Sequence, residues 1–210
     1  MKRNLLTHVY SLILITCYLC HPLKAESINT FSKSDKDLTL AEEIIEILEE
    51  EHFIKLKFKD IQNEATQEYI NNIDPNHTIF LDHEVLDFIV GNILNIDESL
   101  EQAFEIFNLY SQRYKFRYNL QIDFLEVINL NDLFQEKEII LDRSEQDWET
   151  DLVGLKKLWK DFMVNDLISL MLNGNSLKDS KEKITKRLNS QLNYFNKTKN
   201  EDVFDIYINS

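Results

Sequence analysis

The fold is decided by residues 97–125, DESLEQAFEIFNLYSQRYKFRYNLQIDFL. Large apolar and aromatic side chains recur in this stretch every three or four residues, a spacing that places them on one face of an α-helix. They are Leu100, Ala103, Phe104, Phe107, Tyr110, Tyr114, Tyr118 and Phe124 or Leu125. The pattern lasts about eight turns. We therefore expect one long helix, capped by Asp97, that organises the core.

Shorter amphipathic runs on both sides of this stretch predict further helices. We expect them at residues 40–52, 61–74, 82–94, 152–171, 177–196 and 202–208. Thr39 and Glu42 would form a capping box for the first helix, and Pro75 would end the second at Asp74. Ser176 would cap the helix at 177–196, after Asn173-Gly174 has ended the one before it.

Residues 130–148 break the helical spacing, and only residues 138–141 look like a strand. We expect a small extended excursion or hairpin there. The predicted fold class is all-α: an irregular multi-helix domain with one long central helix and this excursion near 130–148. The folded domain is predicted to span residues 38–210, after a flexible, polar lead-in at residues 26–37.

The composition limits the partners of the chain. It has 210 residues, 43% of them hydrophobic and 29% charged, as in an ordinary globular protein. The 3 glycines and 2 prolines are too few for a Gly-rich phosphate loop or a many-stranded β-sandwich. A formal net charge of -14 argues against binding to a phosphate backbone, so we expect no nucleic-acid partner.

The first 25 residues read as a secretory signal. Lys2 and Arg3 precede an apolar run from Leu5 to Cys20, and the segment ends in a small residue, Ala25. We expect cleavage after Ala25 and contact with the membrane only before cleavage, although an uncleaved anchor is a weaker alternative. Cleavage would remove three basic residues, no acidic residue and both cysteines, which changes the net charge from -14 to -17.

Four groups of residues suggest chemistry, and each has a simpler structural interpretation. Ser180 and Lys183 match a Ser-x-x-Lys motif but fall in a charged surface helix. Glu49-Glu50-Glu51-His52 lacks the second histidine of a zinc protease. The remaining two groups are a possible metal cluster, Asp74, His77, Asp82, His83 and Glu84, and a possible base-stacking platform, Tyr110, Arg113, Tyr114, Lys115, Phe116, Arg117 and Tyr118.

The simpler interpretation is preferred for these two groups as well. The histidine and carboxylate spacing fits no metal motif, so we expect a tight loop that Asp74 starts and Asp82 ends as a helix cap. The aromatic residues are expected to form the buried stripe of the long helix, with the basic residues as flanking cations. We therefore predict no catalytic, cofactor-binding or metal-binding residue.

Three motifs remain beyond the helical pattern. YINNIDPNHTIFL occupies residues 69–81, LDRS at 141–144 leads to Trp148 and to a Leu-Trp pair at 158–159, and EDVF occupies 201–204. In their order and spacing across residues 38–210, these motifs together resemble the N-terminal domain of bacterial tail-specific proteases, also called C-terminal processing proteases.

The resemblance implies a periplasmic helical wall around a protease core, with PDZ and protease domains as partners and a docking surface that can serve a lipoprotein adaptor. The protease domain of the family uses a serine activated by a lysine, and this resemblance places no catalytic residue before Ser210. The leading hypothesis is a non-catalytic N-terminal domain, present as a split or truncated piece and inactive by itself. The alternative is a stand-alone periplasmic binding or adaptor protein built on the same helical domain.

If the chain is a truncated piece, we expect its final segment to be poorly packed. Val203, Phe204, Ile206 and Tyr207 would lack packing partners in the final segment and would promote association of the chain.

Overall fold

A computed structural model describes residues 30–51, 57–91, 93–133 and 138–210. The chain divides into two units, Met1–Thr30 and Phe31–Ser210, and the second contains all the helices considered below. The predicted signal at residues 1–25 and its cleavage site lie outside the described residues. Within the described ranges, none of the helices combines the length and the apolar character needed to span a bilayer.

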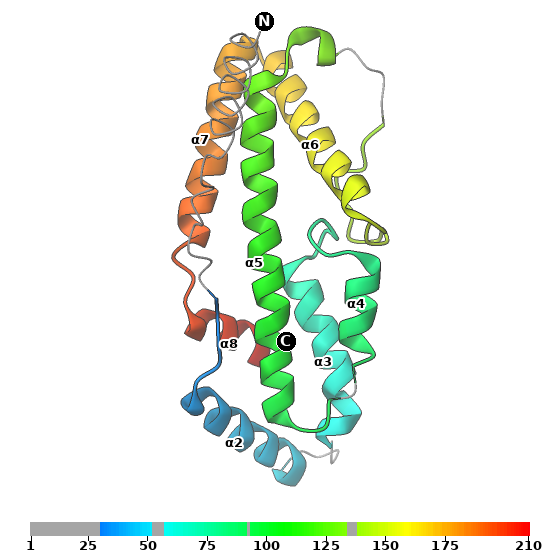
Figure 1. Cartoon of the computed structure of the whole chain (residues 1–210), viewed down its shortest axis with the longest axis vertical. Helices are drawn as coiled ribbons and strands as arrows, with labels where there is room; N and C mark the ends of the chain where they lie inside the picture. The colour runs from blue at the N-terminus through cyan, green and yellow to red at the C-terminus, as the bar shows by residue number, and fades with distance from the viewer. Residues whose placement is uncertain (1–29, 52–56, 92, 134–137) are drawn as a thin grey trace, which may run out of the picture. The chain divides into compact units, whose positions relative to one another are not determined.

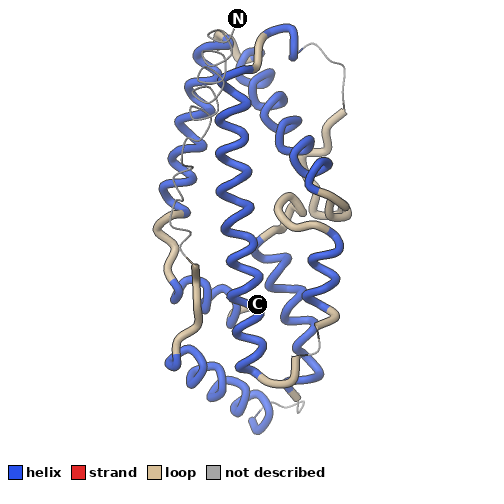
Figure 2. The backbone as a smooth tube through the Cα atoms, in the orientation of Figure 1, coloured by secondary structure: helices blue, strands red, loops and turns tan. Residues whose placement is uncertain are grey.

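The described residues form α-helices and one 3-10 turn, which confirms the all-α class (Figures 1 and 2). The elements are α2 (Asp35–Glu51), α3 (Phe58–Ile73), α4 (Asp82–Ile89), α5 (Ile96–Val127), η1 (Leu130–Leu133), α6 (Leu152–Leu172), α7 (Leu177–Phe195) and α8 (Asn200–Ile208). In the described part of the predicted excursion there is no hairpin. The one β feature of the described residues is an isolated parallel bridge between Leu81 and Glu149, directly after the excursion.

The predicted long helix is α5, which has 32 residues. It contacts α2, α3 and α8 toward its N-terminal end and α6 and α7 toward its C-terminal end (Figure 1). Its cap is Asn95, whose side chain accepts a hydrogen bond from the Glu98 amide at 3.0 Å. The prediction of Asp97 as the cap is wrong, because Asp97 already lies in the first turn, where it pairs with Lys33.

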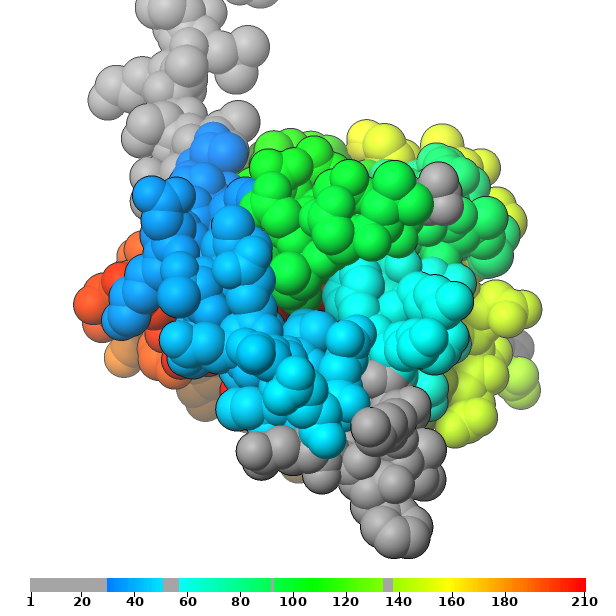
Figure 3. Space-filling model, turned by 90° about the horizontal axis from the view of Figure 1, so that it is seen from below, coloured from blue at the N-terminus to red at the C-terminus, as the bar shows by residue number. Residues whose placement is uncertain are grey.

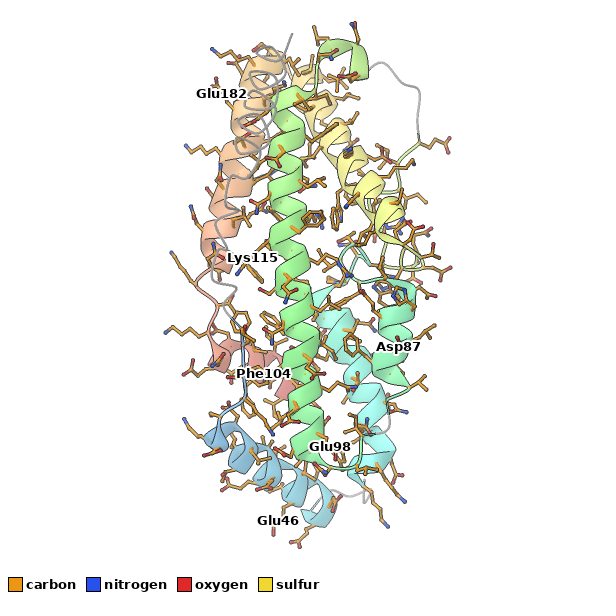
Figure 4. All side chains as sticks on the ribbon, in the orientation of Figure 1. Glu46, Asp87, Glu98, Phe104, Lys115 and Glu182 are labelled. Carbon is orange, nitrogen blue, oxygen red and sulfur yellow. The ribbon has the colours of Figure 1, made fainter. Side chains whose placement is uncertain are left out.

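The apolar residues of the chain form two main clusters along α5. The first gathers around Phe104 and Phe107 and includes α3 and α8, whereas the second lies between α5, α6 and α7 around Leu125 and Leu167. In Figure 4 the labelled Phe104 marks the first cluster, while the labelled Glu46, Asp87 and Glu182 are on exposed faces. Part of the negative charge of the chain therefore lies on its solvent-exposed surface.

The aromatic stripe of α5 is confirmed as a packing surface. Tyr114 stacks on Tyr118 and on Phe195 of α7, with ring centroids 4.4 and 4.3 Å apart. Burial raises the pKa of Tyr110 and Tyr114, so neither phenol ionises near neutral pH. Phe116 is the exception, because it is 43% exposed and meets Trp159 edge-on instead.

The fold begins earlier than the predicted residue 38. Phe31 is buried in an edge-to-face contact with Phe107, with ring centroids 5.0 Å apart, and the Asn108 side chain bonds both to its amide and to its carbonyl at 2.8 Å. Helix α2 then starts at Asp35, so residues 35–37 belong to a helix and not to a flexible lead-in. Thr39 consequently lies inside α2, where its hydroxyl bonds to the Asp35 carbonyl, and does not cap it.

The other predicted helix limits are mostly confirmed. Helix α3 ends at Ile73, just before Asp74-Pro75, and Ser176 caps α7 by accepting from the Asp179 amide at 3.1 Å. Helix α4 is shorter than predicted, since it ends at Ile89 and leaves Leu94 exposed.

Helix α2 borders an open space in the packing of the helices. Figure 3 shows a hollow between α2, α3 and the start of α5. It has a volume of about 330 Å³ and is lined by apolar side chains that include Ile44, Leu48 and Ile61, with Tyr207 of α8 among them. The α2 residues on this wall are only half-buried, so Ala41 and Phe31 provide the buried contacts of this region.

The last segment of the chain is well packed, so the expectation of poor packing is wrong. Val203, Phe204 and Tyr207 of α8 are buried, and Ile206 is the partly exposed member of the set. The Tyr207 ring meets Tyr69 of α3 edge-to-face at 5.3 Å, and its hydroxyl bonds to the Ser99 hydroxyl at 2.5 Å. Helix α3 and the start of α5 thus supply the packing partners that the hypothesis of a truncated piece had placed outside this chain.

Candidate functional site

The loop between α3 and α4, residues 74–81, is held by many hydrogen bonds and contains the second part of the first sequence motif. Asp74 ends α3, and its buried carboxylate accepts hydrogen bonds from three backbone amides that follow it. These are Thr78 at 2.8 Å, Ile79 at 2.9 Å and Phe80 at 3.1 Å. The loop therefore folds around one carboxylate, a role that goes beyond the turn start predicted for Asp74.

Two tryptophans of the second motif fix this loop from outside. The Trp148 indole donates to the Asp74 carboxylate at 3.2 Å, and its ring stacks on His77 with centroids 3.7 Å apart. The fully buried Trp159 of α6 donates its indole N–H to the Thr78 carbonyl at 2.7 Å. Motifs that are about seventy residues apart in the chain thus form one structural unit.

The DRS motif connects residues 142–149 to the same loop. Arg143 donates its guanidinium to the Glu149 carboxylate and to the Asp147 carbonyl, both at 3.1 Å. The Glu149 carbonyl then accepts from the Asp82 amide at 3.1 Å, beside the bridge to Leu81. Arg143 therefore fixes the conformation of the segment that positions Trp148.

Two of the basic residues predicted to flank the aromatic stripe of α5, Arg113 and Arg117, complete the site. Arg113 donates to the Ile79 carbonyl at 3.0 Å and forms a two-pronged ion pair with Glu84 at 2.5 and 2.6 Å. Arg117 donates to the Thr78 hydroxyl at 2.9 Å. Both guanidinium groups point inward, because the 74–81 loop offers oxygen acceptors on that side of α5.

The ion pair predicts a pH dependence of stability. Burial acts to raise the pKa of Glu84, but the hydrogen bonds from Arg113 and from the Leu81 amide outweigh it and lower the pKa below its ordinary 4.5. A lowered folded-state pKa means that the pair stabilises the fold above about pH 4.5 and that this contribution is lost as the pH falls through the lowered value. Glu84→Gln is expected to cost about 1–3 kcal/mol of unfolding free energy at pH 7 and less at pH 3.

Urea unfolding of both proteins at the two pH values measures this difference. Glu182→Gln is the matched control, because the pair between Glu182 and Lys178 is exposed and should contribute little. An equal cost of Glu84→Gln at pH 7 and pH 3 would contradict the role assigned to the ion pair.

The residues of the possible metal cluster do not converge. Among the described residues, no group of three or more histidine, cysteine, aspartate or glutamate side chains is placed to hold a metal ion. His77 bonds through Nδ1 to the Gln146 carbonyl, and His83 is exposed on α4. The cap of α4 is Leu81, whose amide donates to Glu84 at 2.9 Å, so the prediction of Asp82 as the cap is wrong.

The Ser-x-x-Lys match does not form a reactive pair. Ser180 is completely buried in α7, which contradicts its predicted position on a solvated surface, and its hydroxyl has no hydrogen-bond partner among the residues that the structure describes. Lys183 lies on the exposed side of the helix, where it bonds to Asn175. Glu49 and Glu50 are exposed near the end of α2, as predicted, and His52 lies outside the described residues.

Comparison with known proteins accounts for this arrangement. The profile of a family described as "Tail specific protease N-terminal domain" matches residues 44–210. The chain belongs to this family of tail-specific protease N-terminal domains. The tail-specific protease of Haemophilus influenzae is 30% identical over 169 residues, which cover 78% of this chain and 24% of that protein. The chain thus spans about a quarter of the length of that relative.

The match confirms the family resemblance inferred from the three motifs, all of which lie within residues 44–210. In this tail-specific protease N-terminal domain the motifs serve the fold. The first two form the loop site around Asp74, and the third places Val203 and Phe204 in the core beside α3 and α5.

Proposed function

We propose that the chain is the non-catalytic N-terminal part of a tail-specific serine protease, which degrades proteins with unstructured C-termini in the periplasm. In this proposal the helices act as a scaffold and docking surface for PDZ and protease domains. Membership of the family of tail-specific protease N-terminal domains carries the proposal. The Haemophilus relative, of which this chain covers a quarter, supports it.

The contacts that join the helices support a scaffold role. The third motif is fixed to the rest of the domain through buried contacts of α8, including the Tyr207 bond to Ser99 at 2.5 Å. The loop site fixes α3, α5 and α6 to one another through Asp74, Arg117 and Trp159. Partner domains that bind such a frame would be held at defined positions.

The chain alone is expected to cleave no casein. Its Ser-x-x-Lys pair cannot attack a peptide bond, because Ser180 is buried and Lys183 is bonded elsewhere. A fluorescent casein assay on the purified chain measures this. The proposal would be contradicted by casein cleavage that persists through two chromatographic steps, is lost in Ser180→Ala and is kept in Ser190→Ala. Ser190 is an exposed serine of the same helix.

A pull-down with the tagged chain from a periplasmic extract tests the assignment of partners. Recovery of a PDZ-containing serine protease supports the scaffold role, and recovery of a lipoprotein together with that protease supports an adaptor docking on this domain. Recovery of an unrelated periplasmic protein without the protease would favour the stand-alone adaptor. Export itself is tested by N-terminal sequencing of the mature protein, which should begin at Glu26.

A further inference from the structure

A polar cleft of about 410 Å³ lies beside the loop site, where α5, α6 and α7 meet. Thr78 of the loop and Arg117 of α5 form one side, while Phe162 of α6 and Arg187 of α7 also line it. Its volume lies in the range of sites that bind small molecules or single side chains, roughly 300–1,000 Å³. The cleft differs from the apolar hollow beside α2, because charged and amide side chains line it.

Arg117 is the unusual residue of this cleft. Its side chain is partly buried, with Nε closed off from solvent, and burial lowers its pKa, although an arginine still stays charged in proteins. The structure shows one hydrogen bond from its guanidinium, from Nη1 to the Thr78 hydroxyl, and its Nε–H has no partner among the described residues. The rings of Tyr118 and Phe162 lie 5.8 and 5.9 Å from its central carbon. Arg117 thus carries a charge that its hydrogen bonds do not fully satisfy.

The neighbouring carboxylates do not supply what Arg117 lacks. Asp74 acts on Arg117 through its charge, but its oxygens already accept from the amides of the loop and from Trp148. Asp166, the acidic residue of the cleft lining, pairs with Arg187 across the α6–α7 boundary. Two arginines and one aspartate therefore line the cleft, an excess of positive charge in a chain whose net charge is -14.

The free nitrogen of the guanidinium indicates the kind of ligand. Because Nη1 donates to Thr78 and Nε is closed off from solvent, Nη2 is the nitrogen left for a ligand, and it can donate a charge-assisted hydrogen bond to a carboxylate oxygen. Amide side chains of the cleft, including Gln191 and Asn165, can donate further hydrogen bonds to such a group. We propose that the cleft binds a carboxylate through Arg117.

The proposal does not rest on the proposed protease function, since it follows from the charge and bonding of the cleft alone. A carboxylate can reach the cleft as a small free acid or as an acidic side chain of an extended peptide. Both share the group that Arg117 recognises. Calorimetric titration of the full chain with glutarate, and separately with the peptide acetyl-Ala-Glu-Ala-amide, distinguishes these two sources.

At least one of these probes is expected to bind wild type, whereas glutaramide, which has amides in place of carboxylates, should not. Arg117→Gln should weaken binding about 10- to 100-fold, the loss expected for a charge-assisted hydrogen bond. Lys36→Gln removes the same charge from an exposed site on α2 and should leave binding unchanged. If both probes bind, the cleft recognises the carboxylate itself. If only glutarate or only the peptide binds, the ligand is a small free acid or an acidic peptide side chain, respectively.

A second cleft variant keeps the proposal testable if Arg117→Gln fails to fold, which circular dichroism would reveal. Asn165→Leu retains Arg117, removes an amide from the lining and should also weaken binding. The proposal is overturned if neither probe binds wild type at about 10 mM, or if the folded Arg117→Gln variant binds as tightly as wild type. It is equally overturned if Arg117→Gln does not fold and Asn165→Leu leaves the affinity unchanged.

Discussion

Asp74→Ala is expected to lower the free energy of unfolding by about 3–5 kcal/mol. The substitution leaves the amides of Thr78, Ile79 and Phe80 and the indole of Trp148 without their acceptor in a buried loop. Each unpaired buried donor costs about 1–3 kcal/mol, and partial entry of water reduces the sum. Urea unfolding followed by tryptophan fluorescence measures the loss, because Trp148 reports directly on this site.

The matched control is Asp87→Ala, which removes the same group from an exposed position on α4. It should change the unfolding free energy by less than about 0.5 kcal/mol. If Asp74→Ala costs no more than this control, the loop does not depend on the carboxylate and the account of the site is wrong.

Trp159→Ala should have an effect of similar size, about 3–5 kcal/mol. Trp159 is the largest fully buried side chain, packs with Leu81 and Leu155, and donates to the Thr78 carbonyl at 2.7 Å. The alanine variant loses both the packing and the hydrogen bond. Trp159→Phe retains most of the packing, so it should cost less than the alanine variant, and the remaining loss measures the indole hydrogen bond.

Leu172→Ala controls for a large-to-small change on the same helix, since Leu172 is 83% exposed at the end of α6. Its effect should be close to zero. Thermal unfolding of the three variants and of wild type is the measurement. Equal melting temperatures of Trp159→Ala and Leu172→Ala would refute the view that Trp159 joins α6 to the loop.

Local signals in the sequence were sufficient for most of the helices. The spacing of Leu100 to Leu125 predicts α5, Pro75 predicts the end of α3, and Ser176 predicts the start of α7. Each of these signals acts within a few residues, through side-chain periodicity, a fixed backbone angle or a capping hydrogen bond. The prediction of the fold class therefore needed no long-range information.

The loop site could not be predicted in the same way, because its bonds join residues far apart in the chain. Asp74 and Trp148 are 74 positions apart, and Trp159 and Thr78 are 81 positions apart. Helical spacing places Arg113 and Arg117 on α5 but does not show whether they face solvent or an acceptor. The motifs at 69–81 and 141–159 were visible, and the structure adds the physical reason that they occur together.

The errors at the two ends of the fold have a related cause. Polar residues around Phe31 resemble a disordered segment, and only the contact with Phe107 and Asn108 reveals a packed chain. The apolar residues of α8 resemble an unpaired face until Tyr69 and Ser99 are seen to cover Tyr207. In both cases partners distant in sequence determine burial.

The central claim is that this chain is the N-terminal part of a tail-specific protease. Its most direct test is the nucleotide sequence after codon 210 in the gene and in its transcript. The account predicts that it encodes a PDZ domain and a serine–lysine protease domain, in frame or one frameshift away. A transcript and a gene region without either domain would contradict the claim, and the chain would then have to act as a separate binding protein.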